Sequence, residues 1–182
     1  MLALLIIDLQ NASVSGEPPA IEADAVVRRI NALAAAVRPR GLVVIIQHTD
    51  PDEGFSRDSE AWQLVPALDQ KPGDLRLEKT ACDAFLETEL ETLLQRHGVT
   101  EVIITGCATE FCVDTTARAA ASRCFQVCVA SDAHTTSDQP YLPAHKIIEH
   151  HNQSLAGLLL PRQRKLRVAT TAELLAELTS TS

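Results

Sequence analysis

Three side chains in this sequence have the chemical character needed to cleave an acyl bond. Cys112 stands near the start of a predicted helix, where the helix dipole and unpaired N–H groups favour a thiolate nucleophile. A nearby ammonium such as that of Lys79 would lower the pKa of the thiol further, and the carboxylate of Asp8 could accept its proton and later pass it to a leaving group. Taken singly, they have simpler interpretations as a buried thiol, a solvated surface charge and a turn cap.

The elements predicted around these residues indicate how they could meet. Short apolar runs predict buried strands at residues 3–7, 42–46, 102–105 and 127–130, and we expect further short strands at 74–78 and 166–169. Helical spacing of apolar residues predicts helices at 23–37, 84–97, 109–122 and 142–160. We therefore predict an α/β fold, a single three-layer αβα domain over residues 1–182 with about six strands in a mostly parallel sheet.

Polar residues follow several of these strands, at the edge where parallel sheets bind ligands. Asp8 follows the first strand, His48 and Asp50 follow the second, Lys79 follows residues 74–78, and residues 105–112 follow the fourth apolar run. The segment 49–73 breaks the alternation of strands and helices and carries several prolines and glycines. Its length is typical of a lid or binding loop, and Phe55 and Trp62 are its bulky apolar members.

Composition excludes several classes of function. The chain has 182 residues, of which 46% are hydrophobic, and a formal net charge of −8, which disfavours nucleic acid and anionic membranes as partners. The N-terminal apolar run meets Asp8 too early for a signal peptide or a membrane span, so we expect a buried strand there. Five cysteines without a disulfide-scaffold pattern predict free thiols and a cytoplasmic location.

Three segments carry a resemblance to a known family. The runs Leu4-Leu-Ile-Ile-Asp8-Leu-Gln10-Asn11, Lys79-Thr-Ala-Cys-Asp-Ala-Phe85 and Thr105-Gly-Cys-Ala-Thr-Glu-Phe-Cys-Val113 resemble the isochorismatase-like cysteine hydrolases in order and spacing. The match continues through Ser131-Asp-Ala-His134 and residues 147–152, so that it covers nearly the whole chain. This superfamily, which includes the nicotinamidases, has a Rossmann-like α/β fold.

The resemblance implies roles for particular residues. It implies a catalytic triad of Asp8, Lys79 and Cys112, an oxyanion hole from the N–H groups of Ala108 and Cys112, and a cis peptide bond between Cys107 and Ala108. It also implies a homo-dimer or homo-tetramer. For the substrate we expect contacts with Gln10, Phe55, Trp62 and Phe111, because bulky rings could hold a small planar group.

The sequence departs from the nicotinamidase pattern at the metal site. Those relatives carry Asp-x-His after the second strand, whereas this chain has Gln47-His48-Thr49-Asp50 and no further histidine before His97. We therefore expect no metal and no cofactor.

The functional hypothesis is hydrolysis of a C–N bond in a small amide or ureido substrate through a Cys112 thioester. One alternative is an isochorismatase-type enol-ether hydrolase in which Asp8 acts as the acid. Another is a non-enzymatic module that binds a small molecule or resembles a receiver domain, although the lysine is misplaced for a receiver.

Overall fold

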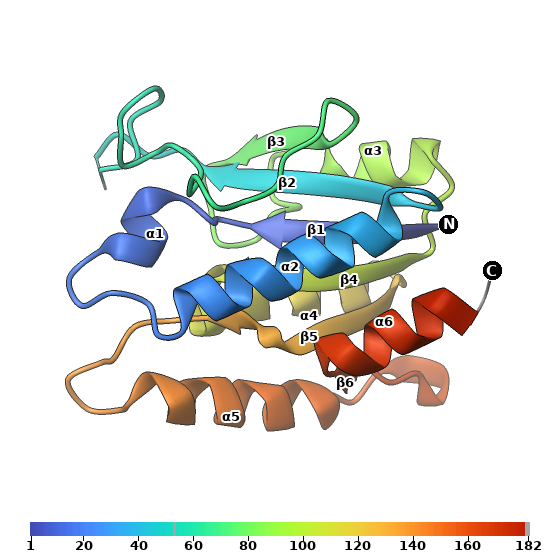
Figure 1. Cartoon of the computed structure of the whole chain (residues 1–182). Helices are drawn as coiled ribbons and strands as arrows, with labels where there is room; N and C mark the ends of the chain where they lie inside the picture. The colour runs from blue at the N-terminus through green and yellow to red at the C-terminus, as the bar shows by residue number, and fades with distance from the viewer. Residues whose placement is uncertain (53, 181–182) are drawn as a thin grey trace.

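A six-stranded parallel sheet forms the centre of the molecule (Figure 1). The computed structural model describes residues 1–52 and 54–180. The strands lie in the order β3-β2-β1-β4-β5-β6, and all adjacent pairs run parallel. Their bounds are β1 Leu2–Ile7, β2 Leu42–His48, β3 Leu75–Lys79, β4 Glu101–Cys107, β5 Gln126–Thr135 and β6 Arg167–Ala169.

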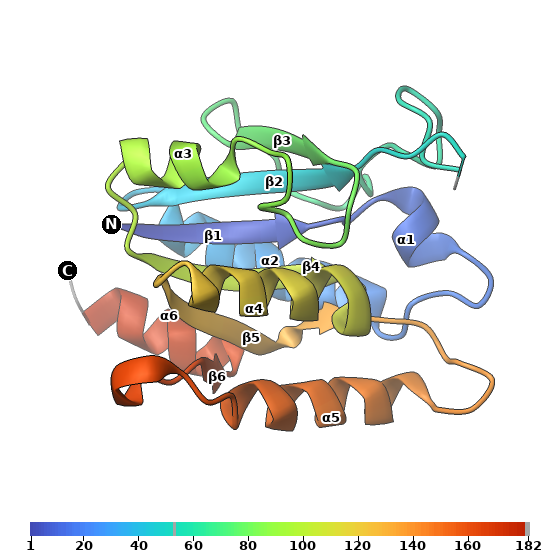
Figure 2. The same cartoon turned by 180° about the vertical axis from the view of Figure 1, so that it is seen from behind.

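Helices cover both faces of this sheet. The helices α2 (Ala23–Val37) and α6 (Thr171–Ser180) lie on the face seen in Figure 1. The helices α3 (Leu90–Arg96), α4 (Asp114–Ser122) and α5 (Ala144–Ala156) lie on the opposite side, which faces the viewer in Figure 2. The short helix α1 (Asn11–Ser15) follows β1, and one 3₁₀ turn (Pro161–Gln163) precedes β6.

Alternation along the central strand divides the core into two clusters. Leu4 and Ile6 of β1 pack into the cluster that holds α2, while Ala3, Leu5 and Ile7 pack into the cluster that holds α3 and α4. These side chains are fully buried, and burial of each leucine or isoleucine contributes about 1.5–3 kcal/mol. A strand that is buried on both faces reads as a continuous apolar run, as residues 2–7 do.

The predicted three-layer α/β architecture is confirmed, with differences in the helices. The helix 23–37 has the predicted bounds, whereas the predicted helix 84–97 is helical from Leu90 to Arg96. There Thr88 interrupts the pattern, since its hydroxyl donates to the Ala84 carbonyl and accepts from the Leu90 N–H. In place of the predicted helix 109–122, the structure has a π-helix (η1, Thr109–Val113) followed by α4. The predicted helix 142–160 is shorter in the structure and runs from Ala144 to Ala156.

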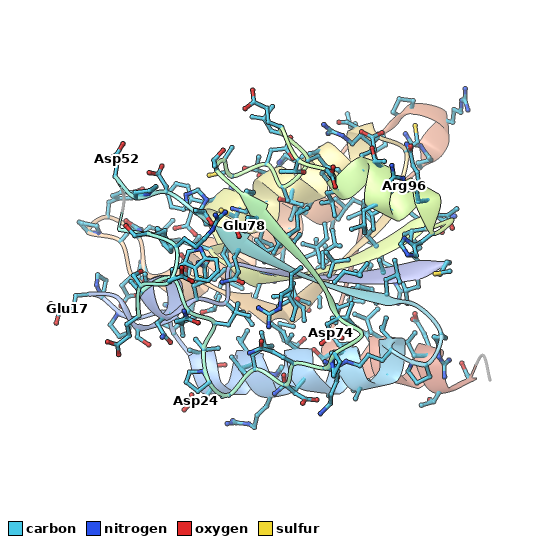
Figure 3. The ribbon with its side chains drawn as sticks, turned by 90° about the horizontal axis from the view of Figure 1, so that it is seen from above. Glu17, Asp24, Asp52, Asp74, Glu78 and Arg96 are labelled. Carbon is cyan, nitrogen blue, oxygen red and sulfur yellow. The ribbon has the colours of Figure 1, made fainter. Side chains whose placement is uncertain are left out.

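One end of the sheet carries a structural ion pair, and the other end carries the candidate site. Figure 3 shows Asp74 near the start of β3 beside α2, with Glu78 toward the other end of that strand. At the start, Arg38, which directly follows α2, binds the carboxylate of Asp74 through two nitrogens at 2.9 Å and so ties the end of the helix to the β3 edge. The carboxyl ends of the strands carry the candidate site. No helix among the described residues is long and apolar enough to cross a membrane.

Candidate active site

The ends of neighbouring strands bring Asp8, Lys79 and the segment that carries Cys112 together. Asp8 directly follows β1 and has a φ of +49°, a left-handed conformation that its N–H stabilises by donating to the Ile46 carbonyl at 2.9 Å. Lys79 is the last residue of β3. Cys112 lies in η1, five residues after the end of β4 at Cys107. The parallel register therefore places all three side chains at one edge.

The ammonium of Lys79 is the centre of this arrangement. Its Nζ lies 2.7 Å from Oδ2 of Asp8, donates to Sγ of Cys112 at 3.2 Å and lies 3.4 Å from Nδ1 of His48. Because an ammonium has donors alone, Nδ1 of His48 must accept in this contact. Lys79 is 2% exposed and Asp8 is 3% exposed, so this is a buried ion pair in contact with a thiol.

Burial controls the proton affinities at this site. Burial raises the pKa of Asp8 above its ordinary value, and the neighbouring Lys79 ammonium offsets only part of that increase. The pKa of Lys79 is also raised: burial alone would lower it, but the Asp8 carboxylate and the Cys112 sulfur outweigh that effect. The protonation states of Asp8, Lys79 and the Cys112 thiol are therefore linked.

The structure contradicts the expected helix-start activation of Cys112. Burial, followed by the negative charge of Asp8, raises the pKa of the Cys112 thiol, and Lys79 counters this only in part. A raised pKa favours the neutral thiol over the thiolate. Oδ1 of Asp8 is buried and has no hydrogen-bond partner among the described residues, so an acceptor is available beside it.

A constrained backbone segment presents the nucleophile. The peptide bond between Cys107 and Ala108 is cis. Gly106 has a φ of +120°, and a Cβ there would lie 2.0 Å from the Ile7 carbonyl oxygen, so glycine is required where β4 meets β1. In η1 the N–H groups of Phe111 and Val113 both donate to the Ala108 carbonyl, one on each side of Cys112. A π-helical turn of this kind is frequent at functional sites.

A pocket with a cavity volume of about 530 Å³ is lined by Asp8 and Cys112. Of the predicted substrate-contacting residues, Phe55 and Phe111 line this pocket. Further lining residues are Asp8, Ser13, His48, Asp50, Thr80, Ala81, Cys82, Cys107, Ala108 and Cys112. The sequence analysis did not identify Ser13 or Thr80 as pocket residues. Thr80 directly follows Lys79, and that adjacency was the signal that could have identified it.

Gln10 and Trp62 are not among the residues that line the pocket. Gln10 is fully buried; its amide donates to the carbonyls of His48 and Trp62, and its oxygen accepts from the His48 N–H. The indole of Trp62 donates to Oγ1 of Thr49 at 2.9 Å. Both residues therefore hold the loop after β2 against the end of β1, which positions His48 beside Lys79.

A second buried network supports the nucleophile segment from β5 and α5. His134 of β5 is 2% exposed, with Nδ1 at 2.8 Å from Oγ1 of Thr109 and Nε2 at 3.0 Å from Oδ1 of Asn152. The amide of Asn152 donates to the Ser131 carbonyl, so its oxygen faces His134 and Nε2 carries the proton. Burial lowers the pKa of His134, which agrees with a neutral imidazole that accepts from Thr109.

His48 and Asp50, the residues in place of the nicotinamidase metal motif, both lie on the pocket wall. Among the described residues, no group of three or more His, Cys, Asp or Glu side chains is arranged to hold a metal ion. The expectation of a reaction without metal or cofactor stays a prediction.

Comparison with known proteins identifies relatives of this chain. The Isochorismatase domain model matches residues 2–172. A streptothricin hydrolase of Streptomyces noursei is 36% identical over 143 residues, which cover 78% of this chain and 57% of that protein. The ureidoacrylate amidohydrolase RutB of Caulobacter vibrioides is 36% identical over a shorter stretch of 64 residues, which covers 35% of this chain and 28% of that protein. This chain thus spans little more than half the length of the first curated relative.

A solved structure supports the same assignment. An isochorismatase family protein superposes with a TM-score of 0.84 at 32% identity, covering 93% of this chain and 98% of that one. This chain belongs to the isochorismatase family.

Proposed function

We propose that this protein is a cysteine hydrolase that cleaves a C–N bond of a small amide or ureido substrate through a thioester on Cys112. The observation that carries the proposal is the buried Lys79 ammonium, which contacts both the Asp8 carboxylate and the Cys112 sulfur, two groups that line the pocket. An arrangement of nucleophile, base and cation is what acyl transfer requires.

The reaction begins with transfer of the thiol proton to Asp8 and attack of the Cys112 sulfur on the substrate carbonyl carbon. The tetrahedral oxyanion collapses, the C–N bond breaks, and Asp8 returns the proton to the leaving nitrogen, which departs as ammonia or an amine. Water then adds to the thioester carbonyl while Asp8 accepts a proton from it. Collapse of this second intermediate releases the acid, and the proton on Asp8 returns to the sulfur.

Each residue of the triad has a structural reason for its role. The raised pKa of Asp8 makes its carboxylate a stronger base than an exposed aspartate, and its unpartnered Oδ1 can receive the proton. Lys79 stabilises the thiolate as it forms. We assign the oxyanion hole to the N–H groups of Ala108 and Cys112. The N–H groups that donate to the Ala108 carbonyl are those of Phe111 and Val113, on either side of Cys112, and not that of Cys112 itself.

The named relatives support an amide or ureido substrate. One of them is described as a streptothricin hydrolase and another as an ureidoacrylate amidohydrolase. The alternative of an enol-ether hydrolase is favoured by one observation, since a buried Asp8 with a raised pKa could also act as a general acid. The two mechanisms differ in whether Cys112 carries the substrate.

Trapping the acyl-enzyme tests the proposal directly. The protein is mixed with a panel of small primary amides and ureido acids, quenched in acid after short times and measured by intact-protein mass spectrometry. We expect a mass increase equal to the acyl group, mapped to the peptide that contains Cys112, together with release of ammonia. Turnover without any adduct, unaffected by the replacement of Cys112 with alanine, would move the assignment to acid catalysis by Asp8.

We also propose that the protein forms a homo-dimer or homo-tetramer in the cytoplasm. Several large apolar side chains are exposed on the isolated chain, including Phe111 at 54%, Tyr141 at 83% and Leu159 at 94%. The five cysteines are free thiols in the structure, which agrees with a reducing compartment.

Replacing His134 by phenylalanine is expected to lower kcat about tenfold and to lower the free energy of unfolding by about 1–3 kcal/mol. Phenylalanine keeps the ring shape but leaves the Thr109 hydroxyl and the Asn152 amide oxygen buried without their partner. Urea unfolding and steady-state kinetics measure the two effects. His150→Phe on the exposed side of α5 is the control. A lower stability with unchanged kcat would show that His134 does not position the nucleophile.

A further inference from the structure

Charged groups around the active-site pocket are strongly biased toward negative sign. The carboxylates of Asp8 and Asp50 line it, and no lysine or arginine does so among residues 1–52 and 54–180. The aromatic residues of the wall, Phe55 and Phe111, present rings whose faces attract cations. Glu110, two residues before the nucleophile, has carboxylate oxygens that are buried without a hydrogen-bond partner in the described chain.

The positive charge beneath the pocket is already engaged. The Lys79 ammonium contacts Asp8, Cys112 and His48, and its side chain is fully buried. A substrate carboxylate could bind it only by displacing the Asp8 carboxylate or the nucleophile. Removal of one partner from a buried pair leaves an uncompensated charge, which is strongly unfavourable.

Arg57, on the loop after β2, is also engaged in an ion pair. Arg57 donates through Nε at 3.2 Å and through Nη2 at 2.6 Å to one carboxylate oxygen of Glu78. The same oxygen accepts from the Thr49 hydroxyl, which in turn accepts from the Trp62 indole. This chain of contacts holds Glu78 toward Arg57 and leaves the pocket wall without the arginine fork that recognises a carboxylate.

Asp50 is held in place on the wall. Its N–H and carbonyl both bond to Phe55, at 3.2 and 2.8 Å, and its Oδ1 accepts from the N–H of Asp52 at 3.0 Å. Figure 3 shows Asp52 itself on the outer part of this loop, away from the sheet. Asp50 therefore presents a fixed negative charge to whatever occupies the pocket, and Asp52 does not line it.

We propose that the pocket prefers amides that carry a positive charge near the scissile bond over matched amides that carry a carboxylate, and that Asp50 is the residue that sets this preference. The inference rests on the proposed function, and it names the substrate class of that site. The charge of Asp8 is already paired with Lys79, whereas Asp50 adds a negative charge to a wall on which the described chain places no lysine or arginine. A substrate carboxylate would be repelled by Asp50, and an ammonium group would be attracted by it.

Three amides of similar size but different charge provide the first test: 3-aminopropanamide, propanamide and succinamic acid. We expect kcat/KM to be about tenfold higher for the cationic than for the anionic amide, as expected for a charge several ångströms from a partly solvated carboxylate. Asp50→Asn, which keeps the acceptor for the Asp52 N–H, should reduce this ratio severalfold. Asp52→Asn is the matched control and should leave the ratio unchanged.

A second test does not depend on turnover. Aminoethyl, methyl and sulfonatoethyl methanethiosulfonate modify thiols and differ in charge, and peptide mapping gives their rates at Cys112. Relative to a small free thiol, the cationic reagent should be favoured over the anionic one, and Asp50→Asn should weaken that preference.

The outcomes separate the two proposals. Hydrolysis of propanamide with no effect of substrate charge would overturn the inference and leave the proposed function standing. If none of the amides is hydrolysed, the proposed function fails, and the labelling rates decide the inference alone. A preference for anionic amides that disappears in Arg57→Gln would show that this arginine leaves Glu78 to bind carboxylates, which also overturns the inference.

Discussion

Replacing Cys112 by alanine is expected to lower kcat/KM for an amide substrate by a factor of about 10⁴ or more, because no thioester can form without the sulfur. The loss should fall on kcat rather than on KM, since the pocket walls that hold the substrate stay in place. The free energy of unfolding should change little, because Cys112 is half-buried. The ion pair that stabilises Lys79 is the one with Asp8, and it stays intact when the contact with Cys112 is lost.

Kinetics and denaturant unfolding on the same preparations measure these effects. Cys82→Ala is the matched control, because Cys82 also lines the pocket but is not one of the described partners of the Lys79 ammonium, which are Asp8, Cys112 and His48. That control should keep most of the activity. A Cys112→Ala variant that retains wild-type turnover would exclude the thioester and support an enol-ether mechanism with Asp8 as the acid.

The positions of the triad residues were accessible from sequence because parallel sheets impose a simple rule. An apolar run such as that of β1 identifies a strand that is buried on both faces, whereas the edge strand β3 alternates apolar and charged residues; in both, the residue at the carboxyl end lies at the ligand edge. Asp8 follows β1 directly, and Lys79 ends β3. The long apolar pattern of α2 likewise determines its bounds, since Val26, Ile30, Leu33 and Val37 share one buried face.

The direction in which a side chain points was not accessible in the same way. Gln10 stands two residues after Asp8, yet its amide is engaged by carbonyls 38 and 52 residues further along the chain. Those contacts depend on where the loop after β2 folds back, which no local pattern encodes. The aromatic residues show the same limit, because Phe55 lines the pocket while Trp62, seven residues later, supports Thr49.

The predicted direction of the pKa shift of Cys112 was wrong for a related reason. A position near the start of a predicted helix favours a thiolate, but this segment is a π-helix and the sulfur lies beside a buried carboxylate. Desolvation and the charge of Asp8 then outweigh the helix dipole, which acts only over the first turn. The depth of a group below the surface is a tertiary property, so the direction of this pKa shift required the structure.

Replacing Asp8 by asparagine is expected to lower kcat/KM by a factor of about 10³, because the Cys112 thiol loses the base that must accept its proton. Asparagine has the same shape as aspartate, and its amide cannot take up a proton at any pH of interest. The variant also leaves the Lys79 ammonium buried without a counter-charge, so the free energy of unfolding should fall by about 3–5 kcal/mol. Asp50→Asn provides the control for a carboxylate on the pocket wall that does not contact Lys79.

The pH dependence distinguishes loss of a base from loss of structure. Asp8 must be ionised to accept the proton, and burial raises its pKa above 3.8, so wild-type kcat/KM should increase with pH through a point that lies above that value. Lys79 must stay protonated, and its raised pKa places the decrease at high pH above 10.5. In Asp8→Asn the acid limb should disappear, and the alkaline decrease should move to lower pH, because Lys79 loses the carboxylate that raises its pKa. An unchanged acid limb would mean that a different group accepts the proton, and a merely destabilised protein would regain full activity at a temperature where it is folded.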